Sequence, residues 1–337
     1  MKAIRIHEPG DISVLRYEEV DIPDPGVGQV RVRLRAAGVN HRDIWVRRGS
    51  LGPLSQPIIP GSDGAGEVDA IGAGVTRWSV GQKVVINPGL SCGICPACLS
   101  GNQPSCPAFT IFNGTYAEYA VVPEENLVQM PGGLTFAEAA SVGVPYVTAE
   151  DFLIRSHALP GETMLLWGAT GGLGLATLQL AKLRGLRVVA VTRNANRVEK
   201  LKQAGADEVA VLGSDTSVVD VVQSFTQGHG ADIVVDSLGQ ASFSDSLAAV
   251  RRGGVIVTVG STTGGDVSFE LGRLFRSRIT LLGAFMGSAA ILPRILPLFS
   301  RGVLVPTIDS TYPLEQADQA HDHMETHGVF GKIILTM

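Results

Sequence analysis

Residues 163–185 read TMLLWGATGGLGLATLQLAKLRG: a short apolar run, a glycine-rich turn and a longer segment with helical apolar spacing. Short apolar runs of this kind are typical of buried strands, and the spacing after the turn is typical of an amphipathic helix. A glycine-rich turn at this junction leaves backbone N–H groups at the helix N-terminus, where a pyrophosphate binds. The stretch therefore predicts the phosphate-binding loop of a dinucleotide site.

The loop residues predicted to bind the cofactor are Ala169, Thr170, Gly171, Gly172, Leu173 and Gly174. Ala169 stands where the G-x-G-x-x-G pattern has its first glycine, and a small residue fits that turn. The competing interpretation is a tight turn that serves only close helix packing. The dinucleotide site is favoured because the loop lies between the first strand and the first helix of a repeated alternation.

The regions on either side of the loop predict two domains. Apolar runs and amphipathic segments alternate from Thr163 to the run RITLLGAF at residues 278–285. The runs are continuously apolar, as in parallel strands buried on both faces, so we predict a doubly wound Rossmann domain over residues 146–285. The first ~125 residues contain alternating apolar runs broken by glycines, which indicates a mostly β domain. We predict that this domain spans residues 1–145 and that residues 286–337 return to it through a final strand-like run. The predicted fold class is α/β.

The end of the second strand of this domain selects the cofactor. An NAD site usually has an acidic residue about 20 residues after the glycines, whereas here the strand RVVAVT is followed by Arg-Asn. Hydroxyl and guanidinium donors suit a 2′-phosphate, so we predict NADPH, bound by Thr192, Arg193 and Arg197. For Arg197 taken alone, a solvated charge on a helix face is the better interpretation. Further cofactor contacts are expected just after two later strands, at Ser237, Gly260 and Ser261.

The composition favours a small-molecule ligand. The chain has 337 residues, of which 45% are apolar and 18% charged, in the range of globular domains. Its formal net charge of −5 argues against nucleic acid or an anionic membrane as the main partner. No run approaches the ~20 apolar residues of a spanning helix, and the N-terminus lacks the apolar core of a signal peptide. We predict a cytoplasmic protein.

All four cysteines of the chain lie in the stretch CGICPACLSGNQPSC, residues 92–106. The spacing C-x2-C-x2-C-x7-C allows four thiolates to surround one Zn²⁺ tetrahedrally, and a closed shell of four thiolates is typical of a structural site. A reducing compartment disfavours the alternatives, which are disulfides and a redox dithiol. The predicted ligands of one structural Zn²⁺ are Cys92, Cys95, Cys98 and Cys106.

Together with other motifs along the whole chain, these features resemble the medium-chain dehydrogenase/reductase superfamily, which contains zinc alcohol dehydrogenases and quinone oxidoreductases. The other motifs are GVNHRDIWVRRG (38–49), PIIPGSDGAGEVDAIGAGV (57–75), GTYAEYAVVPEENLVQMP (114–131), GADIVVDSLG (230–239) and FGKIIL (330–335). The resemblance implies a GroES-like domain formed by residues 1–145 and 286–337, with a zinc lobe near residues 90–108 and a Rossmann domain between the two segments. It also implies a homodimer through the edge strand near residues 278–285.

The ligands of a catalytic zinc are missing from the positions that the resemblance assigns to them. Zinc alcohol dehydrogenases have a cysteine, a histidine and a second cysteine where this chain has Asn40, Ser62 and Val144. Asp63 stands in place of the family's glutamate, but a single carboxylate does not make a three-ligand catalytic site. Arg42 occupies the position of the Ser or Thr that begins the alcohol dehydrogenase proton relay. We therefore predict a reaction without a catalytic metal.

The missing metal limits the chemistry. An alcohol is a poor hydride donor until its hydroxyl proton is removed, which a metal assists. A quinone or an activated alkene accepts a hydride directly when hydrogen-bond donors stabilise the oxygen that gains charge. The sequence predicts an NADPH-dependent reductase of quinones or α,β-unsaturated carbonyls. The alternatives are an alcohol dehydrogenase with an atypical metal shell around Asp63, and an NADPH-binding redox sensor without turnover.

The predicted catalytic residues are Asn40, Asp43, Trp45 and Asp63. The competing interpretations are a helix cap for Asn40, a loop-stabilising hydrogen bond for Asp43 and core packing for Trp45. The resemblance adds two cofactor contacts, His41 at a phosphate and Thr148 against the nicotinamide.

Three further histidines lie near the C-terminus, at positions 321, 323 and 327. Only the last two share a helix face. We interpret all three as a polar helix surface rather than a metal site.

Overall fold

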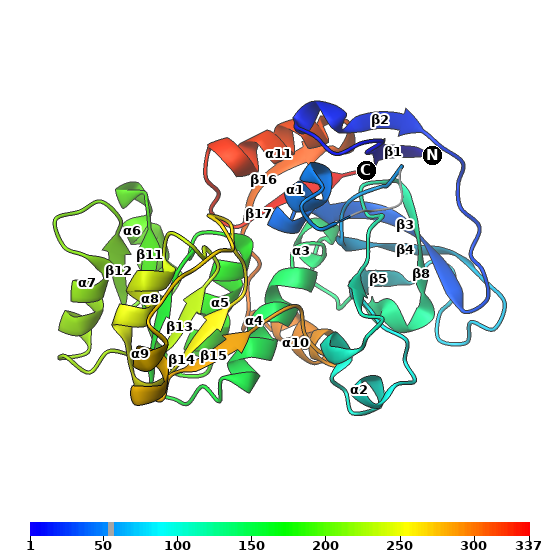
Figure 1. The fold of residues 1–337 in the computed structure, drawn as a ribbon. Helices are drawn as coiled ribbons and strands as arrows, with labels where there is room; N and C mark the ends of the chain where they lie inside the picture. The colour runs from blue at the N-terminus through cyan, green and yellow to red at the C-terminus, as the bar shows by residue number, and fades with distance from the viewer. Residues whose placement is uncertain (53–56) are drawn as a thin grey trace. The chain divides into compact units, whose positions relative to one another are not determined.

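The computed structural model describes residues 1–52 and 57–337. Contacts within the chain divide it into two compact units, residues 1–147 with 288–337, and residues 148–287. Figure 1 labels the helices and strands of both units. In the described part of the chain, no helix is long and apolar enough to cross a membrane.

Residues 148–287 form a sheet in which every neighbouring pair of strands is parallel. In spatial order its strands are β12 (Glu208–Val211), β11 (Arg187–Thr192), β10 (Thr163–Leu166), β13 (Ala231–Asp236), β14 (Val250–Thr258) and β15 (Thr280–Gly283). Numbered along the chain, this is the order 3-2-1-4-5-6 of doubly wound dinucleotide-binding sheets. The Rossmann fold predicted from the strand and helix alternation is confirmed.

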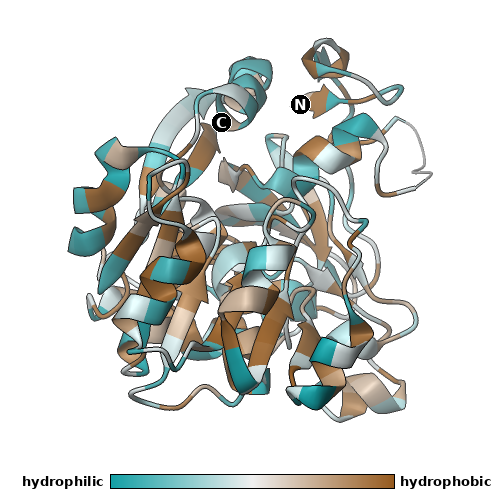
Figure 2. Cartoon of the chain, turned by 60° about the vertical axis from the view of Figure 1, so that its left-hand side comes forward, coloured by the Kyte–Doolittle hydropathy of each residue, from teal (hydrophilic) through white to brown (hydrophobic). Residues whose placement is uncertain are grey.

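Helices connect these parallel strands, as crossovers between parallel strands require. They are α5 (Gly172–Leu183), η4 (Ala195–Arg197), α6 (Val198–Gln203), α7 (Val218–Phe225), α8 (Phe243–Ala249) and α9 (Leu271–Arg276). Helix α4 (Gly143–Arg155), which begins in the other unit, precedes the first strand, β10. All of β10 is buried, and Leu165, Val189, Val234 and Ile256 from four adjacent strands share one core cluster. Figure 2 shows the hydrophobic residues concentrated on such strands. Burial on both sheet faces explains why these strands are continuously apolar.

The other unit is built on a second, mostly antiparallel sheet. Its strands are, in spatial order, β16 (Ile308–Pro313), β17 (Lys332–Thr336), β3 (Gln29–Gly38), β4 (Asp63–Ile71), β5 (Lys83–Ile86) and β9 (Leu127–Gln129), and β8 (Tyr119–Pro123) also pairs with β3. The C-terminal strand β17 lies antiparallel to β3, with Ile334 opposite Gly38 (Figure 1). Both ends of the chain therefore build one domain, as the GroES-like fold requires.

Short elements complete this unit. The remaining strands are β1 (Lys2–Arg5), β2 (Arg16–Glu19), β6 (Gly89–Leu90) and β7 (Thr110–Ile111). The helices are η1 (Ile12–Val14), α1 (His41–Arg48), α2 (Pro96–Leu99), η2 (Gln103–Ser105), η3 (Glu124–Asn126), α3 (Phe136–Ala139), α10 (Ile291–Ser300), η5 (Leu314–Gln316) and α11 (Ala317–Thr326). Helix α1 follows β3 directly and α11 packs on β16 and β17, so residues from both chain ends meet around the start of α1.

Candidate functional site

The predicted phosphate loop joins β10 to α5. Gly168 has a left-handed φ of +66°, which glycine adopts without strain, and Gly171 precedes the first helical residue. A Cβ at Gly174 would lie 2.2 Å from the Gly168 carbonyl oxygen, so only glycine lets α5 approach the loop so closely. Gly171 has no side chain with which to cap the first N–H groups of α5, which leaves them available to an anion. The loop fits a diphosphate, and Gly168 is a residue that sequence analysis missed.

The residues predicted to bind a 2′-phosphate lie at and after the end of β11. The Thr192 hydroxyl is buried and accepts a 3.1 Å hydrogen bond from the Asn194 N–H, so it shapes the turn. Arg193 is exposed, and its guanidinium has no hydrogen-bond or ion-pair partner within the described residues. Arg197 is partly buried at the end of η4. Arg193 is therefore the residue of this group that is best placed to receive an anion from solvent.

The residues predicted after β13 and β14 lie close to the phosphate loop. A Cβ at Gly168 would be 2.6 Å from the Ser237 Oγ, and a Cβ at Gly260 would be 2.9 Å from the Ser237 carbonyl oxygen. Ser261 follows on the exposed side of the same turn. The structure thus brings these predicted residues together at the carboxyl edge of the sheet. Thr148 lies inside α4, with its hydroxyl 3.8 Å from the Met286 sulfur.

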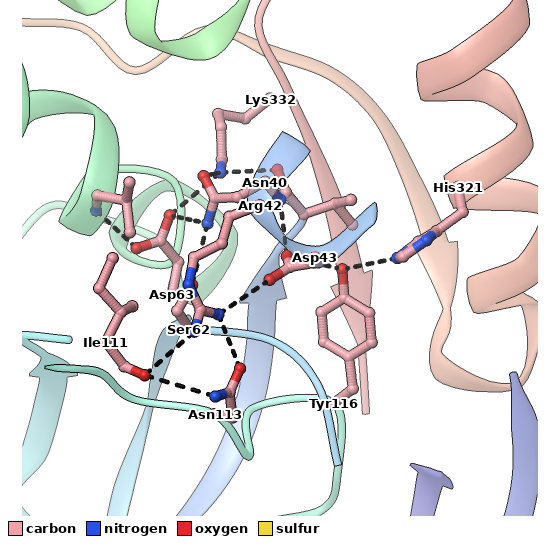
Figure 3. A network of polar contacts seen from close by, with 12 residues as sticks. Asn40, Arg42, Asp43, Ser62, Asp63, Ile111, Asn113, Tyr116, His321 and Lys332 are labelled. Carbon is pink, nitrogen blue, oxygen red and sulfur yellow. Dashed lines mark hydrogen bonds and ion pairs between the residues drawn. The ribbon is translucent and has the colours of Figure 1, made fainter. Parts of the chain in front are cut away.

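In the other unit, Asn40, Asp63 and Lys332 form a buried polar group (Figure 3). The Lys332 ammonium donates to the Asn40 Oδ1 at 2.7 Å, to the Val39 carbonyl at 2.8 Å and to the Asp63 Oδ2 at 3.1 Å. The Asn40 Nδ2 donates to the same Asp63 oxygen at 2.9 Å. The other carboxylate oxygen of Asp63 accepts a 2.7 Å hydrogen bond from the Val144 N–H. The buried ammonium and carboxylate therefore compensate one another, and both atoms of the Asn40 amide are oriented.

Three adjacent strands place this group. Asp63 begins β4, Lys332 begins β17, and Asn40 follows β3, which pairs with both of the other strands. Gly38 of β3 lies opposite Asp63, and a Cβ there would be 3.1 Å from both the Asp63 Cβ and the Lys332 Cε. The same Cβ would lie 2.4 Å from the Ala140 carbonyl oxygen, so a glycine is needed at position 38, mainly because of this backbone contact. Sequence analysis missed Lys332, although it lies in the FGKIIL motif.

Asp43 belongs to a second buried chain of hydrogen bonds next to this group. Its Oδ2 accepts from the Asn40 N–H at 2.8 Å and from the Tyr116 hydroxyl at 3.1 Å, so it fixes the start of α1. Burial raises the pKa of Asp43 to about 6. Burial and the neighbouring Asp43 charge also raise the pKa of Tyr116, which stays protonated and can donate. Asp43 thus holds Asn40 through its backbone and does not itself face the Asn40 amide.

His321 is the last member of this chain of hydrogen bonds. The prediction that it lies on a polar helix surface is wrong. It is fully buried, and its Nδ1 lies 3.2 Å from an Nη of Arg47 while its Nε2 lies 3.2 Å from the Tyr116 hydroxyl. Because arginine only donates, Nδ1 is the acceptor and Nε2 carries the proton. Burial lowers the pKa of His321 to about 3, so the ring is neutral. Residues two apart on a helix point to opposite faces, which separates His321 from His323.

His41 and Trp45 lie one turn apart on α1. Their ring centroids are 5.2 Å apart in an edge-to-face contact, and both side chains are partly buried. Burial lowers the pKa of His41, so the imidazole is neutral near pH 7. The contact between the His41 and Trp45 rings is not part of the hydrogen-bonded group around Asn40.

The residues at the expected catalytic-metal position do not fit a metal ion. Both oxygens of Asp63 already accept hydrogen bonds, and the Lys332 ammonium contacts one of them, Oδ2, where a cation would bind. Asn40 and Ser62 add only neutral groups, 3.5 Å apart. Within residues 1–52 and 57–337, no three His, Cys, Asp or Glu ligand atoms converge outside the cysteine cluster. The positive charge at this position belongs to Lys332.

The four cysteines do fit a metal ion. Their sulfur atoms all lie within 4.8 Å of one another, and none is in a disulfide. The Sγ–Sγ distances are 3.6 Å for Cys95–Cys98, 3.6 Å for Cys92–Cys106 and 3.9 Å for Cys92–Cys98. Four thiolates bound tetrahedrally at ~2.3 Å from Zn²⁺ would be about 3.8 Å apart. The cluster therefore has the dimensions of a four-thiolate zinc site.

Comparison with known proteins identifies the family. The model of the alcohol dehydrogenase GroES-like domain matches residues 26–132, and that of the zinc-binding dehydrogenase matches residues 172–301. An alcohol dehydrogenase of Geobacillus stearothermophilus is 33% identical over 329 residues, which cover 95% of this chain and 96% of that protein. The chain belongs to the medium-chain dehydrogenase/reductase superfamily. It is thus an oxidoreductase, and the family implied by its motifs is confirmed.

Within this superfamily the chain is similar to members of two functional classes. A quinone oxidoreductase of Rattus norvegicus is 30% identical over 350 residues, covering 100% of this chain and 98% of that protein. The solved structure of an NAD-dependent alcohol dehydrogenase is 38% identical, with a TM-score of 0.96 over 100% of both chains. Overall similarity does not separate the two classes, so the choice between them rests on the site residues.

Proposed function

We propose that this oxidoreductase transfers a hydride from NADPH to a quinone or an α,β-unsaturated carbonyl without a catalytic metal. The observation that carries the proposal is the Lys332 ammonium, which donates to Asn40 and Asp63 where an alcohol dehydrogenase binds its catalytic zinc. A buried ammonium supplies positive charge without an open coordination position, so it cannot bind and acidify an alcohol as zinc does.

Asn40 is the proposed donor to the substrate oxygen. Because Lys332 only donates, it fixes Oδ1 as its acceptor and turns Nδ2 towards Asp63. One N–H of Nδ2 binds Asp63 at 2.9 Å, and the other has only a 3.5 Å contact with the Ser62 hydroxyl. Asn40 is 8% exposed, so this second N–H is the one available to a substrate. It would stabilise the oxygen that becomes negative during the reaction.

NADPH, when bound, supplies the hydride that adds to the β-carbon. The alkene π electrons then form a double bond between the α-carbon and the carbonyl carbon, the carbonyl π electrons move onto the oxygen, and a solvent proton added to the α-carbon completes the reduction. In this scheme the chain's own residues orient the carbonyl oxygen on Asn40 and keep the Asn40 amide in one orientation. Lys332 and Asp43 act as positioning residues.

The test is NADPH oxidation with enals, enones and quinones by the wild type and Asn40→Ala. Loss of one donor to a developing oxyanion typically lowers kcat about 100- to 1,000-fold. Asn102→Ala removes an exposed asparagine of the zinc lobe and serves as the control. An N40A enzyme with the kcat of N102A, or a wild type that reduces none of these compounds, would contradict the proposal.

The cofactor is proposed to be NADPH rather than NADH. Exposed Arg193, at the end of β11, supports this assignment because its guanidinium is available to a 2′-phosphate. Arg193→Ala should raise the KM for NADPH and leave that for NADH nearly unchanged, and Arg197→Ala should have the smaller effect. An equal rise for both cofactors would remove the assignment.

An alcohol dehydrogenase remains the second candidate, because the relatives at 33% and 38% identity carry that name. It predicts a second metal per chain and alcohol oxidation that a chelator abolishes. The proposed reductase predicts one Zn²⁺ per chain, held by the four cysteines of the lobe. Elemental analysis of protein purified without added metal separates the two.

We also propose a homodimer, formed through the edge of the parallel sheet. β15 is the last strand of that sheet, and its residue Leu281 is exposed. Exposed sheet edges readily pair with a second copy, and two-fold pairing would extend both sheets.

A further inference from the structure

The guanidinium of Arg42 is partly unsatisfied and largely buried. Arginine has five N–H donors. One Nη1 hydrogen binds the Asn113 Oδ1 at 2.7 Å and one Nη2 hydrogen binds the Ile111 carbonyl at 3.3 Å (Figure 3). The Nε hydrogen and one hydrogen on each Nη have no acceptor among the residues that the structure describes. The side chain is 13% exposed, so only a small part of it is open to solvent or to a ligand.

Asp43 does not neutralise this guanidinium through a hydrogen bond. Its Oδ1 lies 4.0 Å from the Arg42 Nη1 and has no hydrogen-bond partner in the described residues. Its Oδ2 is committed to the Asn40 N–H and the Tyr116 hydroxyl. A buried cation and a buried carboxylate oxygen are thus both left short of partners at the start of α1. The guanidinium therefore keeps N–H donors that an acceptor group of a ligand can bind.

Arg42 lies near the proposed substrate-binding amide. Two contacts, of 4.0 Å and 2.8 Å, link its guanidinium through Asp43 to the Asn40 N–H. Figure 3 draws Arg42, Asn40 and Asp63 as members of one polar group. Arg42 and Asn40 thus lie two residues apart at the start of α1, and Asp43 contacts both, which places the Arg42 guanidinium near a substrate bound at Asn40.

We infer that Arg42 binds a carboxylate of the substrate, so that the natural acceptor is an α,β-unsaturated carbonyl compound that also carries an anionic group. The inference rests on the proposed reductase function. A guanidinium presents parallel N–H donors that match the two oxygens of a carboxylate, whereas a neutral quinone or enone would leave them unpaired. Arg42 would then be a specificity-determining residue, and Asn40 the donor to the oxygen that gains charge.

The test compares 4-oxopent-2-enoate with its methyl ester, which lacks the negative charge and carries one additional methyl group. Hydrogen bonds to a charged group typically contribute enough to change kcat/KM about 10- to 100-fold. We expect the wild type to prefer the carboxylate by that factor, and Arg42→Gln to lose this preference. Arg42→Lys keeps the charge without the planar donor pair and should fall between them. Arg16→Gln, an exposed arginine of β2, is the control.

Binding separates this inference from the proposed function. The saturated product, 4-oxopentanoate, should bind wild type about 10- to 100-fold more tightly than R42Q by calorimetry, whether or not turnover is observed. The role of Arg42 would be overturned if wild type and R42Q bound 4-oxopentanoate equally. It would also be overturned if R42Q lost as much activity with the ester as with the acid. A higher KM for NADPH in R42Q, with the acid preference retained, would assign the guanidinium to a cofactor phosphate and also overturn it. If the wild type reduces neither the acid nor the ester but binds 4-oxopentanoate more tightly than R42Q does, the result would instead contradict the proposed reductase function.

Discussion

Replacing Lys332 by methionine tests whether the buried ammonium stabilises the protein by compensating Asp63. Its Nζ lies 3.1 Å from the Asp63 Oδ2, and the two side chains are 6% and 0% exposed. At this separation two opposite unit charges attract by about 5 kcal/mol at an effective dielectric constant of about 20. Methionine removes this attraction and leaves the Asp63 carboxylate charged in its buried position. We therefore expect the free energy of unfolding to fall by about 3–5 kcal/mol.

Lys2→Met is the matched control in the same unit. The Lys2 ammonium also lies 3.1 Å from a carboxylate, that of Glu19, but these side chains are 44% and 75% exposed. Water and salt screen such a pair, so its loss should leave the unfolding midpoint unchanged. Urea unfolding followed by tryptophan fluorescence measures both variants, because Trp45 and Trp78 lie in this unit.

The double variant Asp63→Asn with Lys332→Met removes both charges. It should recover part of the stability lost in K332M, since a neutral amide costs less to bury than an unpaired carboxylate. A K332M midpoint equal to that of Lys2→Met would refute the reasoning, because the two pairs share one distance and differ in burial. A double variant that is less stable than K332M by the full effect of Asp63→Asn alone would show that the two charges do not interact.

Three further predictions concern the metal, pH and assembly. Cys106→Ser should lower the zinc content from one ion per chain and make the lobe susceptible to limited proteolysis, as elemental analysis and mass spectrometry would detect. Because burial raises the pKa of Asp43 from 3.8 to about 6, the folded state binds this proton more tightly than the unfolded state. Stability should therefore fall by up to about 3 kcal/mol as the pH rises from about 4 to about 6, and urea midpoints of Asp43→Asn should lack this slope. If the proposed dimer forms, Leu281→Lys should convert it to a monomer in light scattering, and a wild-type monomer would contradict the proposed assembly.

Features that depend on neighbouring residues were predictable from the sequence. The glycine loop at 168–174 and the strand before it are local, and repeated strand and helix alternation predicts the parallel sheet. The four-cysteine cluster is equally local, since Cys92 and Cys106 are 14 residues apart and their spacing limits where the thiols can lie. The absence of catalytic-zinc ligands was also readable, because motifs align Asn40 and Ser62 with known ligand positions.

The tertiary structure alone decided what occupies the place of those ligands. Lys332 is 292 residues from Asn40 and 269 from Asp63 along the chain, and the pairing of β17 and β4 with β3 brings the three together. A lysine at the start of a strand is ordinarily exposed, so no periodicity predicts its burial. His321 was misplaced for the same reason: its burial depends on Tyr116 and Arg47, which belong to distant elements. Periodicity and motif spacing determine which elements form and which cofactor they suit, whereas the charges that compensate one another in a buried site are set by long-range strand pairing.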